Sequence, residues 1–305
     1  MKVAIVQDGP DYFQLEKTID RSCTYISTAA EQSCDLIVFG ECWLSGYPFW
    51  LDVCHDVALW DHAPVKEVWA RMFSNSVDVL NGGLKKIQEA VSTHNIHCVI
   101  GLNEIITKGR GNNTIYNTVI TLNNKGEISN HHRKLMPTYT EKLVHGMGDG
   151  FGLKSVDTKF GRIGTLICWE HWMPMARQSM HDEMEDIHIA LWPYVKEMHH
   201  VASRHYAMEG RCHVVSVGQI CYSKDIPKEL NPGLQQNDEF ILKGGSAIYG
   251  PAGNIILEPV YDKAELITVE INLSSNRAES MNLSVSGHYQ RPDIFDYKIN
   301  KERNF

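Results

Sequence analysis

Short apolar runs alternate along the chain with longer segments in which apolar residues recur at helical spacing. Residues 3–7 and 36–39 are almost wholly apolar and have the length of buried strands. Residues 15–32 and 65–94 instead repeat apolar positions every three or four residues, as helices with one buried face do. The second of these segments is broken near Gly82. The N-terminal half is therefore predicted to alternate strands with helices.

The C-terminal half continues this alternation. Residues 163–167, 187–192 and 214–220 are typical of strands, whereas residues 175–185 and 197–211 are typical of helices. Such an order favours an α/β protein whose helices lie outside its sheets. Three further strands are expected at residues 247–249, 255–258 and 266–271.

The length of 305 residues is enough to bury a substantial core in one domain or in two. No linker rich in proline or serine divides the chain, and the chemically interesting residues occur in both halves. We therefore expect residues 1–283 to form a single catalytic domain. Residues 284–305 are polar and irregular, which favours a C-terminal arm at a subunit interface.

Composition narrows the class of protein. A formal net charge of -8 disfavours nonspecific binding to nucleic acid or to an anionic membrane. No apolar stretch approaches the roughly 20 residues that a membrane-spanning helix needs. The N-terminus shows no signal-peptide pattern, and the eight cysteines contain no C-x-x-C pair, as expected for reduced thiols. The expected compartment is the cytoplasm.

Cys168 is the first candidate for chemistry. It directly follows the strand expected at residues 163–167, and α/β proteins commonly place their sites at the carboxyl ends of strands. A helix N-terminus nearby would favour the reactive thiolate. Taken alone, however, a cysteine at a strand end is more often a buried structural residue than a nucleophile.

Three charged residues complete a possible constellation with that cysteine. Glu41 ends an apolar run, where a carboxylate is costly unless it is paired or emerges into solvent. Lys134 and Glu141 are ordinary solvated residues when considered singly. Together, a carboxylate can take the proton of a thiol and an ammonium can stabilise developing negative charge, so the set suits nucleophilic catalysis.

Three segments of the chain carry a family resemblance. Residues 39–48 (FGECWLSGYP), 132–141 (HRKLMPTYTE) and 168–172 (CWEHW) resemble the signature blocks of the nitrilase superfamily, in the order of its Glu–Lys–Cys triad. Residues 146–150 and 286–293 add further similarity, so the resemblance runs almost from end to end.

This resemblance implies a four-layer α-β-β-α sandwich. It also implies that Glu41 is the general base, Lys134 stabilises the intermediate and Cys168 is the nucleophile. Glu141 would be a second carboxylate that positions substrate or water, and backbone N–H groups near Cys168 would stabilise an oxyanion. Neither a metal nor an organic cofactor is implied.

The tripeptide Cys168-Trp169-Glu170 is similar to that of true nitrilases. It implies hydrolysis of a small nitrile to a carboxylic acid and ammonia through a covalent thioimidate and thioester. An amidase or carbamoylase with the same triad, a cyanide dihydratase and a noncatalytic binding protein remain alternatives. The expected partners are a nitrile, water and a second copy of the chain, in a homodimer or larger homo-oligomer.

The expected substrate-binding residues flank the signature blocks. Two departures from the family pattern stand out: Gly40 replaces a frequent proline, which would loosen the backbone, and His145 replaces a large aromatic residue, which would make the pocket more polar. For Trp192, core packing is favoured over a place in the pocket. The residues expected to contact substrate are Tyr47, His145, Trp169, Trp172 and Tyr194.

Two other patterns favour no further site. The glycines at residues 146–152 do not follow a clear strand, which argues against a dinucleotide-binding loop. The histidines lack metal-ligand spacing and are expected to be solvated. They are His181, His188, His199 and His200.

Overall fold

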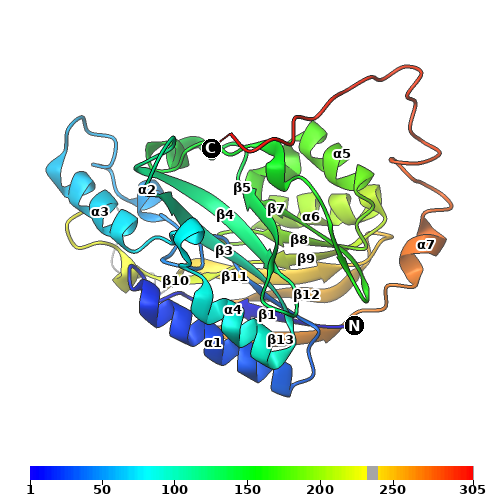
Figure 1. Ribbon diagram of the computed structural model, residues 1–305, viewed down its shortest axis with the longest axis horizontal. Helices are drawn as coiled ribbons and strands as arrows, with labels where there is room; N and C mark the ends of the chain where they lie inside the picture. The colour runs from blue at the N-terminus through cyan, green and yellow to red at the C-terminus, as the bar shows by residue number, and fades with distance from the viewer. Residues whose placement is uncertain (232–239, 305) are drawn as a thin grey trace.

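The computed structural model of the chain describes residues 1–231 and 240–304. Its centre is a pair of β-sheets that lie between two groups of helices (Figure 1). The first sheet has the strand order β13-β1-β2-β3-β4-β5. Its strands are β1 (Lys2–Gln7), β2 (Leu36–Phe39), β3 (His97–Ile106), β4 (Thr114–Leu122), β5 (Ile128–Arg133) and β13 (Glu265–Glu270).

The strict alternation of side chains in β1 explains how this sheet is covered on both faces. Val3 and Ile5 belong to the core shared with the second sheet, whereas Ala4 and Val6 pack with the helices on the outer face. Both faces are apolar, so the strand reads as a continuous hydrophobic run. The helices on this outer face are α1 (Leu15–Glu31) and α4 (Lys85–His94), which pack against each other.

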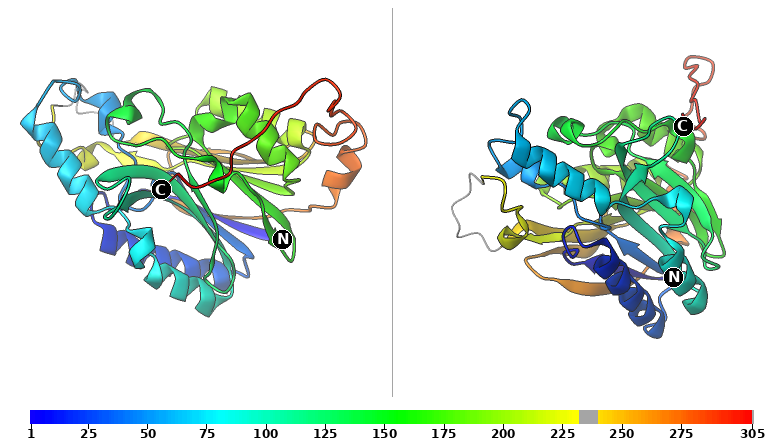
Figure 2. Two further views of the ribbon diagram at one scale, coloured as in Figure 1. Left: turned by 45° about the horizontal axis from the view of Figure 1, so that its top comes forward. Right: turned by 60° about the vertical axis from the view of Figure 1, so that its left-hand side comes forward.

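The second sheet has the order β10-β11-β9-β8-β7-β6, with β12 paired to β11. Its central strands are parallel and wholly buried beneath α5 and α6 (Figure 2). The elements are β6 (Val156–Thr158), β7 (Gly161–Ile167), β8 (Ile187–Leu191), β9 (His213–Val217), β10 (Ile220–Tyr222), β11 (Phe240–Tyr249), β12 (Ile255–Tyr261), α5 (Pro174–Asp182) and α6 (Glu197–Gly210).

The four-layer α-β-β-α arrangement confirms the predicted fold class, while some boundaries differ. The strand expected at residues 214–220 is two strands, β9 and β10, because the chain bends at Gly218. A Cβ there would lie 2.1 Å from the carbonyl oxygen of Gly244, so only glycine lets the two backbones approach this closely. The helix expected at residues 65–94 is α3 (Ala63–Ser74), a short 3-10 turn and α4.

The C-terminal segment after α7 (Ser275–Glu279) has no regular secondary structure as far as residue 304. It passes over the α5 side of the molecule and ends beside β5 (Figures 1 and 2). The Tyr297 hydroxyl donates to Asp182, and Lys301 Nζ lies 2.6 Å from a carboxylate oxygen of Glu183. No helix in the described part of the chain is both long and apolar enough to cross a membrane.

Candidate active site

Strand ends from both sheets meet at one buried position. Glu41 lies just past β2, Lys134 directly follows β5, and Cys168 directly follows β7. One carboxylate oxygen of Glu41, one of Glu141 and the Sγ of Cys168 lie within 4.8 Å of one another. Each of the four side chains is at most 4% exposed. The fold thus brings together the four residues that the sequence singled out.

Lys134 joins the two carboxylates. Its Nζ donates to Glu41 Oε1 at 2.9 Å and to both oxygens of Glu141 at 2.9 and 2.7 Å. The carboxylates and the thiol could also serve as ligands for a metal ion. The ammonium, however, already contacts both carboxylates and offsets part of their negative charge. We therefore interpret the cluster as a site for acid–base and nucleophilic chemistry.

The two carboxylate oxygens of Glu41 differ in their hydrogen bonding. Asn117 Nδ2 donates to Oε1 at 2.7 Å, as Lys134 does, whereas Oε2 has no hydrogen-bond partner among the described residues. Burial raises the pKa of Glu41, and the charge of Glu141 adds to this effect while Lys134 opposes it. A carboxylate of raised pKa with a free oxygen next to a thiol is suited to accept its proton.

The backbone at Glu41 is held rather than loosened, contrary to the expectation from Gly40. The side-chain amide of Gln219 donates to the carbonyl oxygen of Glu41. A Cβ on Gly40 would lie 2.3 Å from the Gln219 side chain, so the glycine makes room for this contact.

Cys168 is a buried thiol with a left-handed backbone. Its φ of 52° is uncommon outside glycine, and it begins a short 3-10 helix, Cys168–Trp172. Burial raises the pKa of the Cys168 thiol well above its usual value, Glu41 adds to this shift, and Lys134 and the Trp169 N–H oppose it. The Trp169 N–H, in the first turn of this helix, does favour the thiolate as expected, but burial outweighs it. The thiol needs a base.

Glu141 is the second carboxylate and behaves differently from the first. It accepts hydrogen bonds from the Tyr47 hydroxyl at 2.8 Å and from the Thr138 N–H at 3.0 Å. Although burial raises the pKa of Glu141, the Lys134 ammonium, His145 and the Thr138 N–H together hold it below its usual value. The pair therefore combines one carboxylate that stays ionised with one that can exchange a proton.

A cavity of about 390 Å³ opens onto Cys168 and Glu141. Three predicted substrate-binding residues line it, namely Tyr47, Trp169 and Tyr194. Sequence reasoning missed several others: two stand inside the block at residues 132–141 without having been singled out, and the rest lie in segments without a motif. The lining residues outside the prediction include Asp52, Tyr139, Thr140, Lys196, His199 and Leu242.

Two predicted substrate-binding residues do not line the cavity. His145 is buried and donates through Nε2 to Asn103 Oδ1 at 2.9 Å, since the amide nitrogen of Asn103 donates to backbone carbonyls. Trp172 packs against Trp192 and His199, with ring centroids 5.5 and 5.4 Å away. Its place is therefore in the wall behind the cavity. Trp192 is fully buried, as favoured from the sequence.

The histidines expected to be solvated are not. His181 is 4% exposed and His188 is fully buried, while His199 and His200 are half-buried. Each makes a hydrogen bond to a protein group, which compensates for the loss of water.

Glu170 connects the two sides of the site, a role that the sequence did not suggest. Its carboxylate accepts from the N–H of Leu135 at 2.8 Å and from the N–H of Ile167 at 2.7 Å. These residues directly follow Lys134 and directly precede Cys168. His132 Nε2 is a further partner at 2.9 Å. The signal available in the sequence was its place in the Cys168-Trp169-Glu170 tripeptide.

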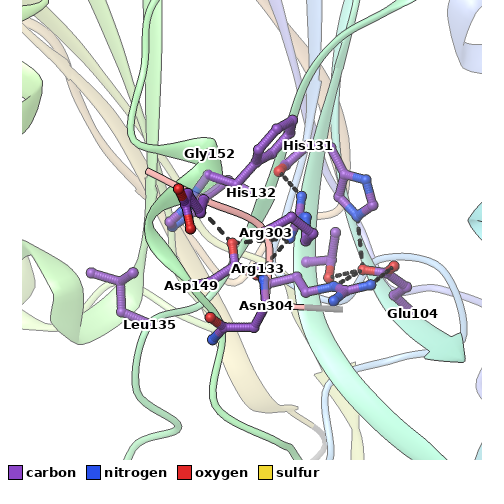
Figure 3. Close-up of polar contacts among 12 residues, drawn as sticks. Glu104, His131, His132, Arg133, Leu135, Asp149, Gly152, Arg303 and Asn304 are labelled. Carbon is purple, nitrogen blue, oxygen red and sulfur yellow. Dashed lines mark hydrogen bonds and ion pairs between the residues drawn. The ribbon is translucent and has the colours of Figure 1, made fainter. Parts of the chain in front are cut away.

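A second polar cluster supports the end of β5, next to Lys134 (Figure 3). Arg133 donates to both oxygens of Glu104, at 2.9 and 2.7 Å. From the C-terminal segment, Arg303 contacts Asp149 at 3.2 Å and donates to the carbonyl oxygen of His131 at 2.7 Å. The arm thus packs on its own chain beside β5, the strand that directly precedes Lys134.

Known proteins with similar sequences and structures fit this geometry. Residues 2–278 match the family model described as carbon-nitrogen hydrolase. The chain is 30% identical to an aliphatic nitrilase from Rhodococcus rhodochrous, with 98% of the chain and 82% of the relative covered. It is also 30% identical to a cyanide hydratase from Botryotinia fuckeliana (strain T4), with 99% and 83% covered. A solved carbon-nitrogen hydrolase from Helicobacter pylori G27 has TM-score 0.73 at 17% identity, covering 97% of this chain and 96% of that one.

The chain belongs to the carbon-nitrogen hydrolase family, because the family model spans almost its whole length. It is accordingly a hydrolase that acts on carbon–nitrogen bonds. The solved structure supports the fold independently of the sequence motifs.

Proposed function

We propose that this protein is a nitrilase that hydrolyses a small organic nitrile to its carboxylic acid and ammonia. The observation that carries the proposal is the cluster of a thiol, an available carboxylate oxygen and an ammonium within one buried site that opens to a cavity. The relatives named as nitrilase and cyanide hydratase support the same chemistry.

The first half of the reaction forms the covalent intermediate. Glu41 Oε2 takes the proton of the Cys168 thiol while the sulfur attacks the nitrile carbon. Negative charge develops on the nitrile nitrogen, where Lys134 and the Trp169 N–H stabilise it. Glu41 then gives the proton to that nitrogen, which leaves a thioimidate on Cys168.

The second half consumes two molecules of water. Glu41 takes a proton from the first water as its oxygen adds to the thioimidate carbon, and ammonia leaves after the nitrogen has gained two further protons. The resulting thioester is hydrolysed by a second water, which releases the acid and restores the thiol. If the tetrahedral intermediate expels the thiolate instead of ammonia, the product is an amide.

Glu141 acts by position in this scheme. Its ionised carboxylate holds the Lys134 ammonium and the Tyr47 hydroxyl at the edge of the cavity. Aromatic side chains of the wall, Trp169 and Tyr194, supply apolar contact to the organic part of the nitrile.

The test is product analysis on a panel of nitriles with their matching amides. The proposal expects acid and ammonia from nitriles, with activity lost in Cys168→Ala. Cys34→Ala, which removes a buried thiol in the core on the outer face of the first sheet, is the matched control and is expected to retain activity. Turnover of amides without turnover of any nitrile would assign the enzyme to the amidase or carbamoylase branch.

Cyanide hydration is a second candidate, supported by the cyanide hydratase relative. Cyanide alone, offered in the same assay, separates the two. The cavity favours a larger substrate, since about 390 Å³ is far more than a diatomic anion fills. A noncatalytic binding protein would turn over nothing and would form no adduct on Cys168.

Assembly and location complete the proposal. Residues 1–283 act as one catalytic domain, and the protein works in the cytoplasm as a homodimer or larger homo-oligomer. Support for self-association comes from apolar side chains that are about half exposed on α5 and α6, and from the exposed part of the arm, residues 288–296. Light scattering after size exclusion measures the mass in solution. The apolar side chains are Met175, Met198, Val201 and Met208.

A further inference from the structure

A chain of buried polar side chains runs from Cys168 away from the cavity. His171 Nδ1 lies 2.7 Å from the Cys168 carbonyl oxygen, and His171 Nε2 lies 2.9 Å from His188 Nε2. His188 Nδ1 lies 2.6 Å from Glu185 Oε2, and the other oxygen of Glu185 accepts from the Tyr206 hydroxyl. Each of these four side chains is at most 6% exposed, and none lines the cavity.

With both histidines neutral, the direction of every hydrogen bond follows from the carbonyl at one end. A carbonyl oxygen only accepts, so His171 donates to Cys168 through Nδ1. A neutral His171 then offers Nε2 as an acceptor, and His188 must donate through its own Nε2. The Nδ1 of a neutral His188 is therefore an acceptor. Its partner, Glu185, must be a protonated carboxylic acid that donates to it.

The electrostatic surroundings agree with a chain that carries no charge. Burial lowers the pKa of His171 to about 3 and lowers that of His188 well below its usual value. Burial raises the pKa of Glu185 to about 8, although His181 opposes the shift. The titratable groups around this carboxyl are His181 on α5, Glu183 and Asp186 in the connection to β8, His188 on β8, Tyr206 and Glu209 on α6, and Cys212 before β9.

We propose that Glu185, His188 and His171 are positioning residues for the reaction at Cys168. As a neutral chain of hydrogen bonds in one direction, they orient and polarise the peptide between Cys168 and Trp169. The C=O and N–H of a trans peptide point in opposite directions, so a donor at the Cys168 carbonyl determines where the Trp169 N–H points. That N–H acts on the Cys168 sulfur, because it opposes the rise in the pKa of the thiol.

The expected effect of this chain on catalysis is electrostatic. A carbonyl that accepts a hydrogen bond makes the N–H of the same peptide a stronger donor, and a chain of such bonds strengthens each member. The left-handed backbone of Cys168 also requires support from its surroundings. This role rests on the proposed function, since the negative charge near the Trp169 N–H develops only when a nitrile is attacked.

The test compares two substitutions at one position. Glu185→Gln retains an N–H donor for His188 and an acceptor for Tyr206, so kcat is expected to stay within about twofold of the wild type. Glu185→Leu removes the donor, and kcat is expected to fall about 10- to 100-fold with little change in KM, because a donor to the oxyanion is weakened. Glu209→Gln, on the neighbouring ion pair with Arg177, is the matched control and is expected to leave kcat unchanged.

The pH dependence of kcat distinguishes this positioning role from a merely structural one. In the wild type, kcat is expected to decline as the pH rises through about 8, where Glu185 loses the proton that the chain needs. Glu185→Gln, which cannot titrate, is expected to lack this decline, whereas Glu209→Gln is expected to retain it. The same decline in Glu185→Gln would overturn the proposal.

The tautomers can be measured without any substrate. Nitrogen NMR of 15N-histidine-labelled wild-type protein is expected to show His171 protonated at Nδ1 and His188 protonated at Nε2, both neutral at pH 7. A charged His188, or one protonated at Nδ1, would contradict the chain. This spectrum does not depend on nitrile turnover. An enzyme that ignores nitriles but has these tautomers would therefore refute the proposed function and leave the hydrogen-bond assignment intact.

Discussion

Two buried polar clusters meet at Cys168, and they differ in whether their buried carboxyl groups are paired with a cation. On the side of the first sheet, Glu41 and Glu141 are paired with the Lys134 ammonium. On the side of the second sheet, Glu185 contacts a histidine and a tyrosine instead of a cation. Burial acts on all three carboxyls, but only those with a cation nearby can remain ionised.

This difference matches the tasks proposed for the two clusters. The charged cluster lies next to the thiol and the cavity, where the proposed reaction transfers protons and forms and breaks bonds. The neutral chain of Glu185, His188 and His171 lies behind the backbone of Cys168. Its proposed task is to orient the peptide between Cys168 and Trp169, and a net charge there would only increase the free-energy cost of burial. Each cluster can be tested by substitutions, and the expected effects on activity and stability differ between the two clusters.

The largest expected effect is on the charged side. Glu41→Gln keeps the shape of the side chain but cannot accept the thiol proton, so kcat is expected to fall roughly 10²- to 10⁴-fold. Steady-state kinetics on a nitrile that the wild type hydrolyses measures the loss. Glu127→Gln, at an exposed turn before β5, serves as the control and is expected to show full activity. Full activity in Glu41→Gln would remove Glu41 from the mechanism.

Removal of the cation tests whether pairing is what allows two carboxylates to be buried together. Lys134→Met leaves Glu41 and Glu141 without their shared partner, so the free energy of unfolding at pH 7 is expected to drop by about 3–5 kcal/mol. Urea denaturation measures it. The loss should shrink at pH 5, where the raised pKa of Glu41 lets it take up a proton. A loss that is the same at both pH values would contradict the pairing.

Glu170 tests the connection between the two sides. Its two oxygens each accept a backbone N–H, and Glu170→Gln retains only one such oxygen. We expect a loss of about 1–3 kcal/mol in unfolding free energy, as for an unsatisfied buried donor. We also expect kcat to fall by about tenfold as Lys134 and Cys168 shift apart. Unchanged kinetics together with lower stability would limit Glu170 to a structural role.

The effect expected on the neutral side appears as a slope of stability with pH rather than as a loss at one pH. The folded protein holds the Glu185 proton up to about pH 8, whereas the unfolded chain releases it near 4.5. Folding is therefore favoured by this group below 4.5, and that stability is lost as the pH rises to about 8. Relative to Glu185→Gln, the wild type should lose stability across this window and not beyond it. A constant difference in urea unfolding from pH 5 to 9 would argue for an ionised Glu185.

Much of the fold and the core of the site could be predicted from the sequence. Apolar runs such as residues 3–7 and 36–39 have few alternatives to buried strands, and Glu41, Lys134 and Cys168 stand in recognisable blocks. The resemblance to the nitrilase superfamily implied that these residues converge, whereas the strand pattern alone did not, because no strand was expected directly before Lys134. Glu141 is placed in the site by a local interaction, because its carboxylate also closes the short turn that begins at Thr138.

The parts that could not be predicted depend on distances between segments that carry no shared pattern. His188 and Glu185 look like surface residues in the sequence, yet α6 covers them and Gly164 leaves room for the carboxyl, since a Cβ there would lie 1.6 Å from Glu185 Oε2. His145 lies near a signature block and Trp172 within one, but neither lines the cavity. The raised pKa of Cys168 also depends on burial, which is a property of the fold rather than of neighbouring residues.

The most direct test of the account is an acid-quenched digest of the enzyme during turnover of a nitrile, read by mass spectrometry. We expect the peptide that contains Cys168 to carry the added mass of the thioimidate or thioester. Cys168→Ala should show neither the adduct nor any acid. Hydrolysis of the nitrile at full rate by Cys168→Ala, or an adduct on another cysteine that accumulates and decays at the turnover rate, would contradict the central claim.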